Sequence, residues 1–329
     1  MPRNPDAACR ALWITGPGQA EIRTTPLPLA GAGMVEVKAL QSGISRGTEA
    51  LVFAGKVPPS EWERMRCPFQ AGSFSFPVKY GYAMVGRVEA GSADLAGRRV
   101  FCLYPHQDHF SVPEAALTPI PDHIPTARAV LACQIETALN AAWDAAPRIG
   151  DRIAVVGGGT IGCLVAWLCA GMMGVEVTLI DPDPDRSAVA AALGFRFAHA
   201  EMAPTGCDLV FHASGSNAGL VTALSLAGFE AEIIEMSWYG DTPVTLPLGT
   251  AFHSQRLSLR SSQVGAVSPA RRARWDHARR MALAVSLAAD PRLDVLVSAA
   301  TAFDRLPEAL PDILGQPGAL CHRVIYQEE

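Results

Sequence analysis

The sequence predicts an α/β protein with a doubly wound parallel sheet, joined to a second domain that is rich in β-structure. Three observations indicate this fold class. An apolar strand over 153–156 is followed by a glycine-rich turn and an apolar segment of helix length. Strand and helix patterns then alternate as far as residue 259, which is typical of a parallel sheet. Before Pro121 the chain instead carries short alternating strands divided by Gly and Pro, as compact antiparallel domains do.

The turn after the first of these parallel strands carries the G-x-G-x-x-G spacing, at Gly157, Gly159 and Gly162. In such a unit the first glycine makes a tight turn and the second lets the backbone approach a pyrophosphate. The third lets helix and strand pack closely. The helix that begins near Thr160 and Ile161 offers free N–H groups and a positive dipole end to phosphates. The turn therefore predicts a dinucleotide site, the alternative being an unrelated βαβ unit with chance glycines.

An acidic residue follows the second strand of this unit, which we expect over 175–180. Asp181 would accept hydrogen bonds from both ribose hydroxyls of an adenosine. The negative charge of Asp181 would repel a 2′-phosphate at this position, so the sequence favours NAD over NADP. Arg186 is a nearby cation that could tolerate such a phosphate, and it leaves NADP open as the alternative.

The remaining elements follow from apolar periodicity and from breakers. In the first part, Val35, Val37 and Ala39 alternate with polar neighbours, and further strand patterns cover 77–89 and 98–103. The segment 58–76 is long enough for a lid or specificity loop, or it is an ordinary surface loop. The parallel sheet should continue with strands over 208–213, 231–236 and 256–259 and helices over 127–146, 184–193 and 217–227.

A basic helix is predicted over 269–289, with Ser268 as its cap and Pro269 at its first position. It carries five arginines between 271 and 280. We interpret this run as a solvated helix face, the alternative being a surface for an acidic partner.

Composition excludes several classes of protein. With 49% hydrophobic and 18% charged residues the chain is expected to fold rather than to be disordered. A net charge of −5 gives no general attraction to nucleic acid or to an anionic membrane. The eight cysteines form no C-x-x-C pair, which argues against a disulfide framework or a zinc ribbon and fits a reducing cytoplasm. No signal peptide is visible at the N-terminus.

The order of these parts resembles the medium-chain dehydrogenase/reductase superfamily, the zinc-type alcohol dehydrogenases and their relatives, over nearly the full length. The resemblance rests on SGISRGTE at 42–49, on the glycine–aromatic segment before the V-G-R-V strand at 85–88, and on the glycine turn. SGISRGTE is also similar to the branch that includes the bacteriochlorophyllide hydroxyethyl dehydrogenases. The resemblance implies a GroES-like catalytic domain from 1–134 and 262–329, with a Rossmann domain inserted at 135–261. It further implies NAD(P)-dependent interconversion of an alcohol and a carbonyl by a homodimer or homotetramer.

The same resemblance assigns cofactor roles to single residues. The three glycines and Asp181 match the dinucleotide motif, and Arg186 matches a basic residue beside the adenosine ribose. Further cofactor contacts are implied for Thr137, for Ser214 in the A-S-G segment, and for Trp238 beside the nicotinamide.

The metal ligands of the zinc-dependent members are mostly missing. Ser45 or Arg46 stands at the first cysteine, Gly81-Tyr82-Ala83 replaces G-H-E, and Cys133 remains at the last position. One thiolate without imidazole or carboxylate cannot complete a tetrahedral zinc site, so catalytic zinc is not expected. Substitute ligands would have to come from Glu49, Glu136 or a joint site of His106 and His109, which needs a turn between them. The four-cysteine structural lobe is missing as well.

Without zinc, the carbonyl must be polarised by hydrogen bonding, because hydride transfer builds negative charge on its oxygen. Tyr82 carries a donor hydroxyl at the vacated ligand position, although it could also be an aromatic that fills the space left by the metal. Thr48 matches the hydroxyl relay of the family, or it is a turn hydroxyl. Arg46 or Lys79 could stabilise the alkoxide or lower the pKa of the tyrosine, the alternative for Lys79 being a solvated charge.

These residues predict hydride transfer between NAD(H) and a small secondary alcohol or ketone bound in a cleft between domains. Two alternatives remain. One is a zinc-free quinone or enone reductase that uses NADPH, and the other is a nucleotide-binding relative that has lost its chemistry.

Overall fold

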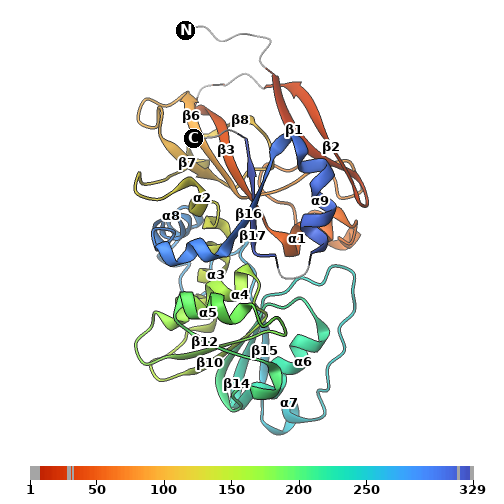
Figure 1. Ribbon diagram of the computed structural model, residues 1–329, viewed down its shortest axis with the longest axis vertical. Helices are drawn as coiled ribbons and strands as arrows, with labels where there is room; N and C mark the ends of the chain where they lie inside the picture. Colours follow the sequence, from red (N-terminus) through yellow and green to blue (C-terminus); the bar gives the residue numbers. More distant parts are fainter. Residues whose placement is uncertain (1–7, 28–30, 32, 317–318, 327–329) are drawn as a thin grey trace. The chain divides into compact units, whose positions relative to one another are not determined.

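The computed structural model describes residues 8–27, 31, 33–316 and 319–326, and the chain divides into two compact units (Figure 1). The first unit combines the N-terminal part up to Cys133 with Ala278–Pro291 and the segment from Val297 onwards. The second unit consists of Gln134–His277 and Arg292–Leu296.

The stretch 262–277, which the sequence analysis assigned to the first domain, is grouped with the second unit. Contacts inside that unit explain this. The Ser268 N–H donates to Asn140 Oδ1 at 3.1 Å, and the Trp275 ring packs 4.9 Å from the ring of Trp143.

Two β-sheets form the first unit. The smaller has the order β2-β1-β5-β4, with β1 (Ala8–Gly16), β2 (Gln19–Pro26), β4 (Ala71–Gly72) and β5 (Val78–Lys79). The larger has the order β16-β17-β3-β6-β7-β9, with β8 also paired to β3. Its strands are β3 (Met34–Ile44), β6 (Met84–Ala90), β7 (Arg99–Cys102), β8 (His109–Pro113), β9 (Thr118–Pro119), β16 (Val297–Ala302) and β17 (Cys321–Ile325). In Figure 1 the blue C-terminal strands lie beside red and orange N-terminal ones, so both ends of the chain build this sheet.

The alternation predicted for β3 is confirmed. Val35, Val37 and Ala39 are buried, and Glu36 and Lys38 between them are partly exposed. The buried residues belong to a core cluster that also contains Met84 and Phe110, from β6 and β8. The pattern of period two therefore specifies which face of the sheet meets the core.

The second unit is built on a parallel sheet with the order β12-β11-β10-β13-β14-β15. The strands are β10 (Arg152–Val156), β11 (Glu176–Ile180), β12 (Arg196–Ala198), β13 (Cys207–His212), β14 (Ala227–Glu235) and β15 (Ser258–Ser261). The chain runs outward from β10 to β12 and then returns to continue on the other side of β10. This order confirms the doubly wound sheet, and it places the topological switch point between β10 and β13.

The helices of the second unit are α3 (Ala132–Ala145), which begins at the end of the first unit, α4 (Thr160–Ala170), α5 (Arg186–Leu193), α6 (Asn217–Leu226) and α7 (Ala251–Ser254). The predicted helix over 127–146 is interrupted, because α2 (Thr126–Ala129) ends before Val130 and α3 begins at Ala132. The interruption lies in the first unit, just before the boundary after Cys133.

The first unit also contains α1 (Arg46–Phe53), α9 (Leu306–Gly315) and most of α8 (His277–Leu287). The prediction for 269–289 is wrong in its first part, because 269–274 form turns, 275–276 are irregular and the helix begins at His277. Arg271 lies over the ring of Trp143 at 5.4 Å, and the Ser268 hydroxyl is buried without a hydrogen-bond partner. Ser268 therefore does not cap a helix, because tertiary contacts to Trp143 fix this segment instead.

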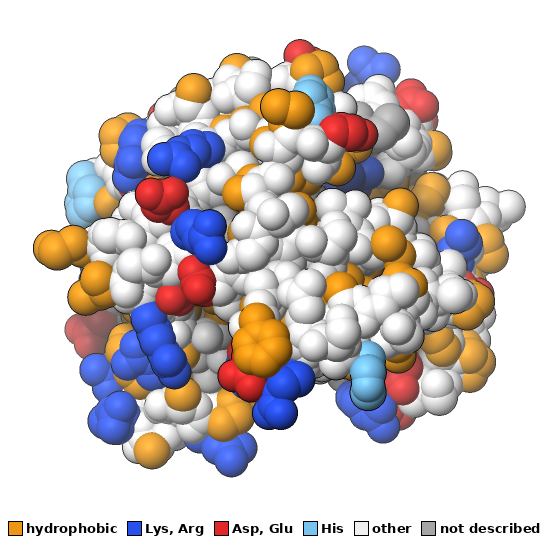
Figure 2. All heavy atoms as spheres, turned by 90° about the horizontal axis from the view of Figure 1, so that it is seen from below, with side chains coloured by type: hydrophobic (Ala, Val, Ile, Leu, Met, Phe, Trp, Pro, Cys, Tyr) orange, Lys and Arg blue, Asp and Glu red, His pale blue; other side chains and the backbone are white. Residues whose placement is uncertain are grey.

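The interpretation of the arginine run as a uniformly solvated face is also wrong at one position. Arg280 is only 1% exposed, whereas the other four arginines between 271 and 280 are exposed. Figure 2 shows acidic and basic side chains intermixed on the face that it presents. Within the described residues, no helix is long and apolar enough to cross a membrane.

Candidate functional site

The glycine turn after β10 brings three backbone segments together at the switch point. A side chain at Gly162 would overlap the carbonyl oxygen of Gly157, so α4 packs against the turn only with glycine there. Gly157 has φ +109°, and a Cβ on it would lie 2.6 Å from the backbone nitrogen of Ser214. Both glycines are therefore required by packing and by backbone conformation.

Gly159 differs from these two. Its φ of −71° suits any residue, and a Cβ there would meet no protein atom within 4 Å. Neither packing nor conformation requires glycine at this position. The open space lies at the N-terminus of α4, whose first residues Thr160 and Ile161 are partly exposed. Free N–H groups and the helix dipole favour an anion there, so the turn fits a pyrophosphate.

Asp181 lies against this turn, directly after β11. Its carboxylate accepts hydrogen bonds from the Gly158 N–H at 2.6 Å and from the Asp183 N–H at 2.9 Å. A Cβ on Gly158 would be 2.9 Å from Cγ of Arg186, so Gly158 also lets the arginine lie beside the turn. The structure thus brings together the glycines, Asp181 and Arg186, which the sequence motif grouped.

The Arg186 side chain is held in place. The residue is 6% exposed, and its guanidinium lies 3.3 Å from the carboxylate of Asp183. A 2′-phosphate on the adenosine would have to compete with Asp183 for this cation, in addition to meeting the charge of Asp181. The arrangement therefore fits an unphosphorylated ribose better than a phosphorylated one.

A second polar group lies at the carboxyl ends of β13 and β14. His212 and Glu235 end these two strands and are neighbours in the parallel register. His212 is fully buried; its Nδ1 is 2.8 Å from a Glu235 carboxylate oxygen and its Nε2 is 2.6 Å from the Ser214 hydroxyl. Ser214 itself is exposed. A buried imidazole and carboxylate thus stand directly behind a serine at the switch point.

Further donors surround the carboxylate of Glu235. The Tyr239 hydroxyl donates to it at 3.0 Å and the Ser237 N–H at 2.7 Å. Burial alone would raise the pKa of Glu235, but hydrogen bonds from His212 and Ser237 lower that pKa overall. Burial and the neighbouring carboxylate raise the pKa of Tyr239. Ser214 was predicted from the sequence, but His212 and Glu235 were not. Both are polar residues at the ends of predicted parallel strands, and this pattern could have indicated that they lie together at the switch point.

In the first unit, two of the residues predicted to act on substrate, Tyr82 and Thr48, lie together. The Tyr82 hydroxyl is hydrogen-bonded to the side chains of Ser45 and Thr48, which come from the start of α1. Burial and the nearby Cys133 and Glu49 raise the pKa of Tyr82 far above its usual value. The prediction that Arg46 or Lys79 lowers this pKa is therefore wrong, because loss of solvent outweighs any nearby cation.

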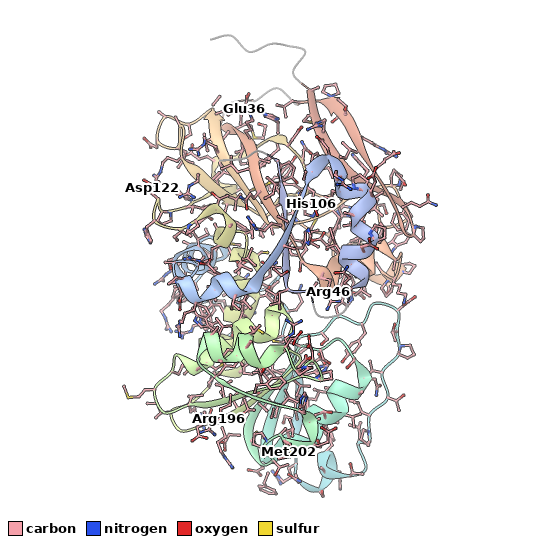
Figure 3. The ribbon with its side chains drawn as sticks, viewed as in Figure 1. Glu36, Arg46, His106, Asp122, Arg196 and Met202 are labelled. Carbon is pink, nitrogen blue, oxygen red and sulfur yellow. The ribbon has the colours of Figure 1, made fainter. Side chains whose placement is uncertain are left out.

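A buried chain of hydrogen bonds lies beside Tyr82. Glu49 accepts from the Ser45 N–H at 2.7 Å, and its other carboxylate oxygen is 3.0 Å from Nε2 of His106. His106 Nδ1 is 2.7 Å from the Ser42 hydroxyl, which is 3.1 Å from the hydroxyl of Tyr326. Gly81 allows this approach, since a Cβ there would be 2.8 Å from the imidazole. Figure 3 shows His106 among the strands of the first unit and Arg46 at α1.

Lys79 lies in a different environment from the predicted one. Its Nζ donates to Gln107 Oε1 at 2.6 Å and lies 5.3 Å from the ring centre of Tyr104. Burial lowers the pKa of Lys79. It is therefore not a solvated strand-edge charge, and these contacts hold it to Gln107 and Tyr104 rather than to Tyr82.

The substitute zinc ligands do not gather into a metal site. His106 turns inward to Glu49, whereas His109 lies 3.6 Å from Asp108 and 3.9 Å from Glu89. Across the described part of the chain, no group of three or more His, Cys, Asp or Glu side chains could hold a metal ion. Tetrahedral zinc needs at least three such ligands, so these residues do not fit it. All eight cysteines are free thiols, and seven of them are buried.

Thr137 and Trp238 are the two remaining cofactor contacts that the sequence predicts. Thr137 lies in the first half of α3, and Trp238 lies three residues after the end of β14. Both are partly exposed. Their roles stay predictions.

Known structures share this architecture. L-idonate 5-dehydrogenase from Escherichia coli K-12 matches at 16% identity and a TM-score of 0.79, over 97% of this chain and 99% of that one. A short chain alcohol dehydrogenase from E. coli CFT073, complexed with NADH, matches at 17% identity and a TM-score of 0.75, over 97% of this chain and 99% of that one. The 2R,3R-butanediol dehydrogenase from Bacillus subtilis matches at 17% identity and a TM-score of 0.76, over 97% and 100%. No family model matches the sequence.

The chain thus shares the fold of these dehydrogenases, with a Rossmann sheet and a β-rich unit of GroES-like type. This is the fold that the resemblance to the medium-chain dehydrogenase/reductase superfamily predicts.

Proposed function

We propose that the protein is an oxidoreductase that interconverts a small secondary alcohol and its ketone by hydride transfer with NAD(H). The observation that carries this proposal is the open space at Gly159, between the N-terminus of α4 and Asp181. Of the glycines in the turn, Gly157 and Gly162 are explained by packing, but Gly159 is not. A ligand that approaches the bare backbone explains it.

The nicotinamide would supply or take up the hydride when the cofactor is bound. Gly157–Gly162 would hold its pyrophosphate and Asp181 the adenosine ribose. The similar structures include one complexed with NADH and another, described as a zinc-binding dehydrogenase from Sinorhizobium meliloti 1021, bound to NADP. Asp181 and the pairing of Arg186 with Asp183 favour NAD here.

Tyr82 is the proposed hydrogen-bond donor to the substrate oxygen. Its raised pKa keeps the phenol protonated, as a donor must be while negative charge grows on the carbonyl oxygen. Ser45 and Thr48 orient the hydroxyl, and Thr48 can pass a proton to or from it. Because these residues do not fit a zinc site, no step is assigned to a metal.

The cofactor is tested by fluorescence titration of the purified protein with NADH and with NADPH. We expect saturable binding of NADH and weaker binding of NADPH, because of Asp181. Tighter binding of NADPH would favour the quinone or enone reductase instead. Binding of neither nucleotide would contradict the proposed function.

The chemistry is tested with a panel of ketones, aldehydes and secondary alcohols. Tyr82→Phe should lower kcat by about 10²–10³-fold with NADH binding intact, the usual effect of removing one oxyanion donor. Tyr104→Phe is the matched control, since Tyr104 stacks on Phe110 at 4.0 Å in the core of the same unit. Equal rates for Tyr82→Phe and the wild type would remove Tyr82 from the mechanism. If the wild type turns over nothing in the panel while it binds NADH, the non-catalytic alternative is favoured.

A further inference from the structure

Two segments that are far apart in the sequence meet at the Tyr82 hydroxyl. Tyr82 follows β5, which ends at Lys79, whereas Ser45 and Thr48 belong to the start of α1. An N-terminal serine of a helix usually caps it, but the Ser45 side chain makes no capping hydrogen bond and is bonded to Tyr82 instead. Another group must therefore hold the start of the helix in place.

Glu49 holds the start of the helix, because both backbone groups of Ser45 are bonded to it. The Glu49 N–H donates to the Ser45 carbonyl at 3.0 Å, which is an ordinary helical bond. The Ser45 N–H donates to Glu49 Oε1 at 2.7 Å, so the glutamate side chain satisfies a donor that the helix leaves unpaired. This arrangement leaves the Ser45 hydroxyl available to Tyr82.

His106 holds the other segment, directly before Tyr82. Its backbone N–H donates to the Tyr80 carbonyl at 3.4 Å, and its own carbonyl accepts from the Leu12 N–H of β1 at 2.9 Å. Its ring lies against Gly81, where a Cβ would be 2.8 Å from Cδ2. Glycine at this position therefore lets the buried imidazole support the backbone that leads into Tyr82.

The two supporting side chains are bonded to each other. Glu49 Oε2 is 3.0 Å from His106 Nε2, and both residues are buried. We propose that Glu49 and His106 are positioning residues, which clamp the start of α1 to the backbone before Tyr82 and so fix the position of its hydroxyl. The role of that hydroxyl rests on the proposed function. A fixed position matters there, because a displacement of about 1 Å can lower the rate by about 10²-fold.

The first test is a double-mutant cycle on kcat, measured at saturating NADH and ketone. A carboxylate has two acceptor oxygens and an amide has one, so Glu49→Gln cannot serve both Ser45 and His106 in the same way. We expect this change to lower kcat about tenfold and to leave KM and the Kd for NADH within about twofold. In a Tyr82→Phe background it should lower kcat by less than about twofold, because no hydroxyl is left to position.

The control for this cycle is Glu61→Gln. Glu61 belongs to an exposed pair with Arg64 in the same unit, and this variant should keep the wild-type kcat. Equal losses from Glu49→Gln in the wild-type and the Tyr82→Phe backgrounds would overturn the inference, because the pair would then act without the hydroxyl.

The second test needs no turnover. In protein labelled with ¹³C-tyrosine, the Cζ resonance of each ring reports the hydrogen bonding of its hydroxyl. Glu49→Gln and His106→Ala should each shift the resonance of Tyr82, which is assigned with Tyr82→Phe. The resonance of Tyr239, in the second unit, should stay at its wild-type position and shows that the variants are folded.

The two tests separate the inference from the proposed function. An unmoved Tyr82 resonance in both variants would overturn the inference, and it would leave the proposed function standing if the wild type reduces a ketone. If the wild type turns over nothing while both variants shift Tyr82, the proposed function is overturned and the clamp stands.

Discussion

The pairing of Glu49 with His106 is where a single side-chain change should affect stability most. Both residues are buried, 5% and 1% exposed, and their side chains are 3.0 Å apart. Removing one partner of a buried pair leaves a polar group without compensation, at a cost of about 3–5 kcal/mol. We therefore expect Glu49→Ala to lower the free energy of unfolding by about that amount, measured by urea denaturation.

Glu61→Ala is the matched control for this prediction. Glu61 pairs with Arg64 at 3.1 Å on the surface, where the arginine side chain is 76% exposed. Exposed pairs contribute about 0–1 kcal/mol, so this variant should remain close to the wild type. If Glu49→Ala and Glu61→Ala lost similar unfolding free energy, the burial of the Glu49–His106 pair would not make it more important for stability than the exposed Glu61–Arg64 pair.

At single residues, local motifs could be predicted and long-range pairs could not. The glycines, Asp181 and Arg186 are close in sequence, and their spacing alone placed them around one turn. Glu49 and His106 were considered only as separate metal ligands, because nothing in the sequence pairs a residue of α1 with one in a distant loop. Tyr82 and Thr48 were predicted separately, as a donor and as a relay hydroxyl, and these roles stay predictions. The direction of the pKa shift of Tyr82 depends on burial, which spacing does not give.

At the scale of the βαβ element, Gly159 and Gly162 offer a matched pair of substitutions. Gly162→Ala should destabilise the protein by about 1–3 kcal/mol, because its Cβ would overlap the Gly157 carbonyl and force backbone movement. Gly159→Ala should leave the free energy of unfolding within about 1 kcal/mol, since a methyl group there meets no protein atom.

Gly159→Ala, the variant with the smaller effect on unfolding free energy, should nevertheless bind NADH more weakly than the wild type in a titration. Gly159→Ala is expected to weaken binding because the methyl group would occupy the position of the pyrophosphate, although the fold is intact. Wild-type affinity in Gly159→Ala would mean that no ligand approaches this backbone.

Strands and helices of the parallel sheet were predicted well because each is specified by a local apolar pattern. The segment 269–289 shows where this fails. Its composition favours a helix throughout, but Arg271 and Trp275 pack on Trp143, and this packing overrides the propensity of the first residues. The helix is also interrupted at Val130, just before the unit boundary after Cys133, and no residue type marks this change.

On the scale of the whole molecule, both units carry acidic groups whose pKa is lowered by folding. Burial alone would raise the pKa of Asp108 in the first unit, but hydrogen bonds from His109 and Arg10 lower it overall. Hydrogen bonds lower the pKa of Glu235 in the second unit in the same way. The pKa of His322 is lowered by burial and by Arg323. In each case the unfolded chain binds a proton at a higher pH than the folded chain does.

The sign of the pH dependence follows from this difference. The stabilising effect of the two carboxylates is complete above their ordinary pKa values and is lost as the pH falls through the folded ones. His322 acts in the same direction from about pH 6.5 downward, because the unfolded imidazole takes up a proton that the folded one resists. The urea midpoint should therefore decrease below about pH 6.5 through His322, and decrease further below about pH 4.5 as the two carboxylates, whose ordinary pKa values are 3.8 and 4.5, take up protons. Asp108→Asn should make the midpoint of the first unit less dependent on pH, and Glu235→Gln should do the same for the second unit. A midpoint that rises on acidification would contradict the lowered pKa values of these carboxylates.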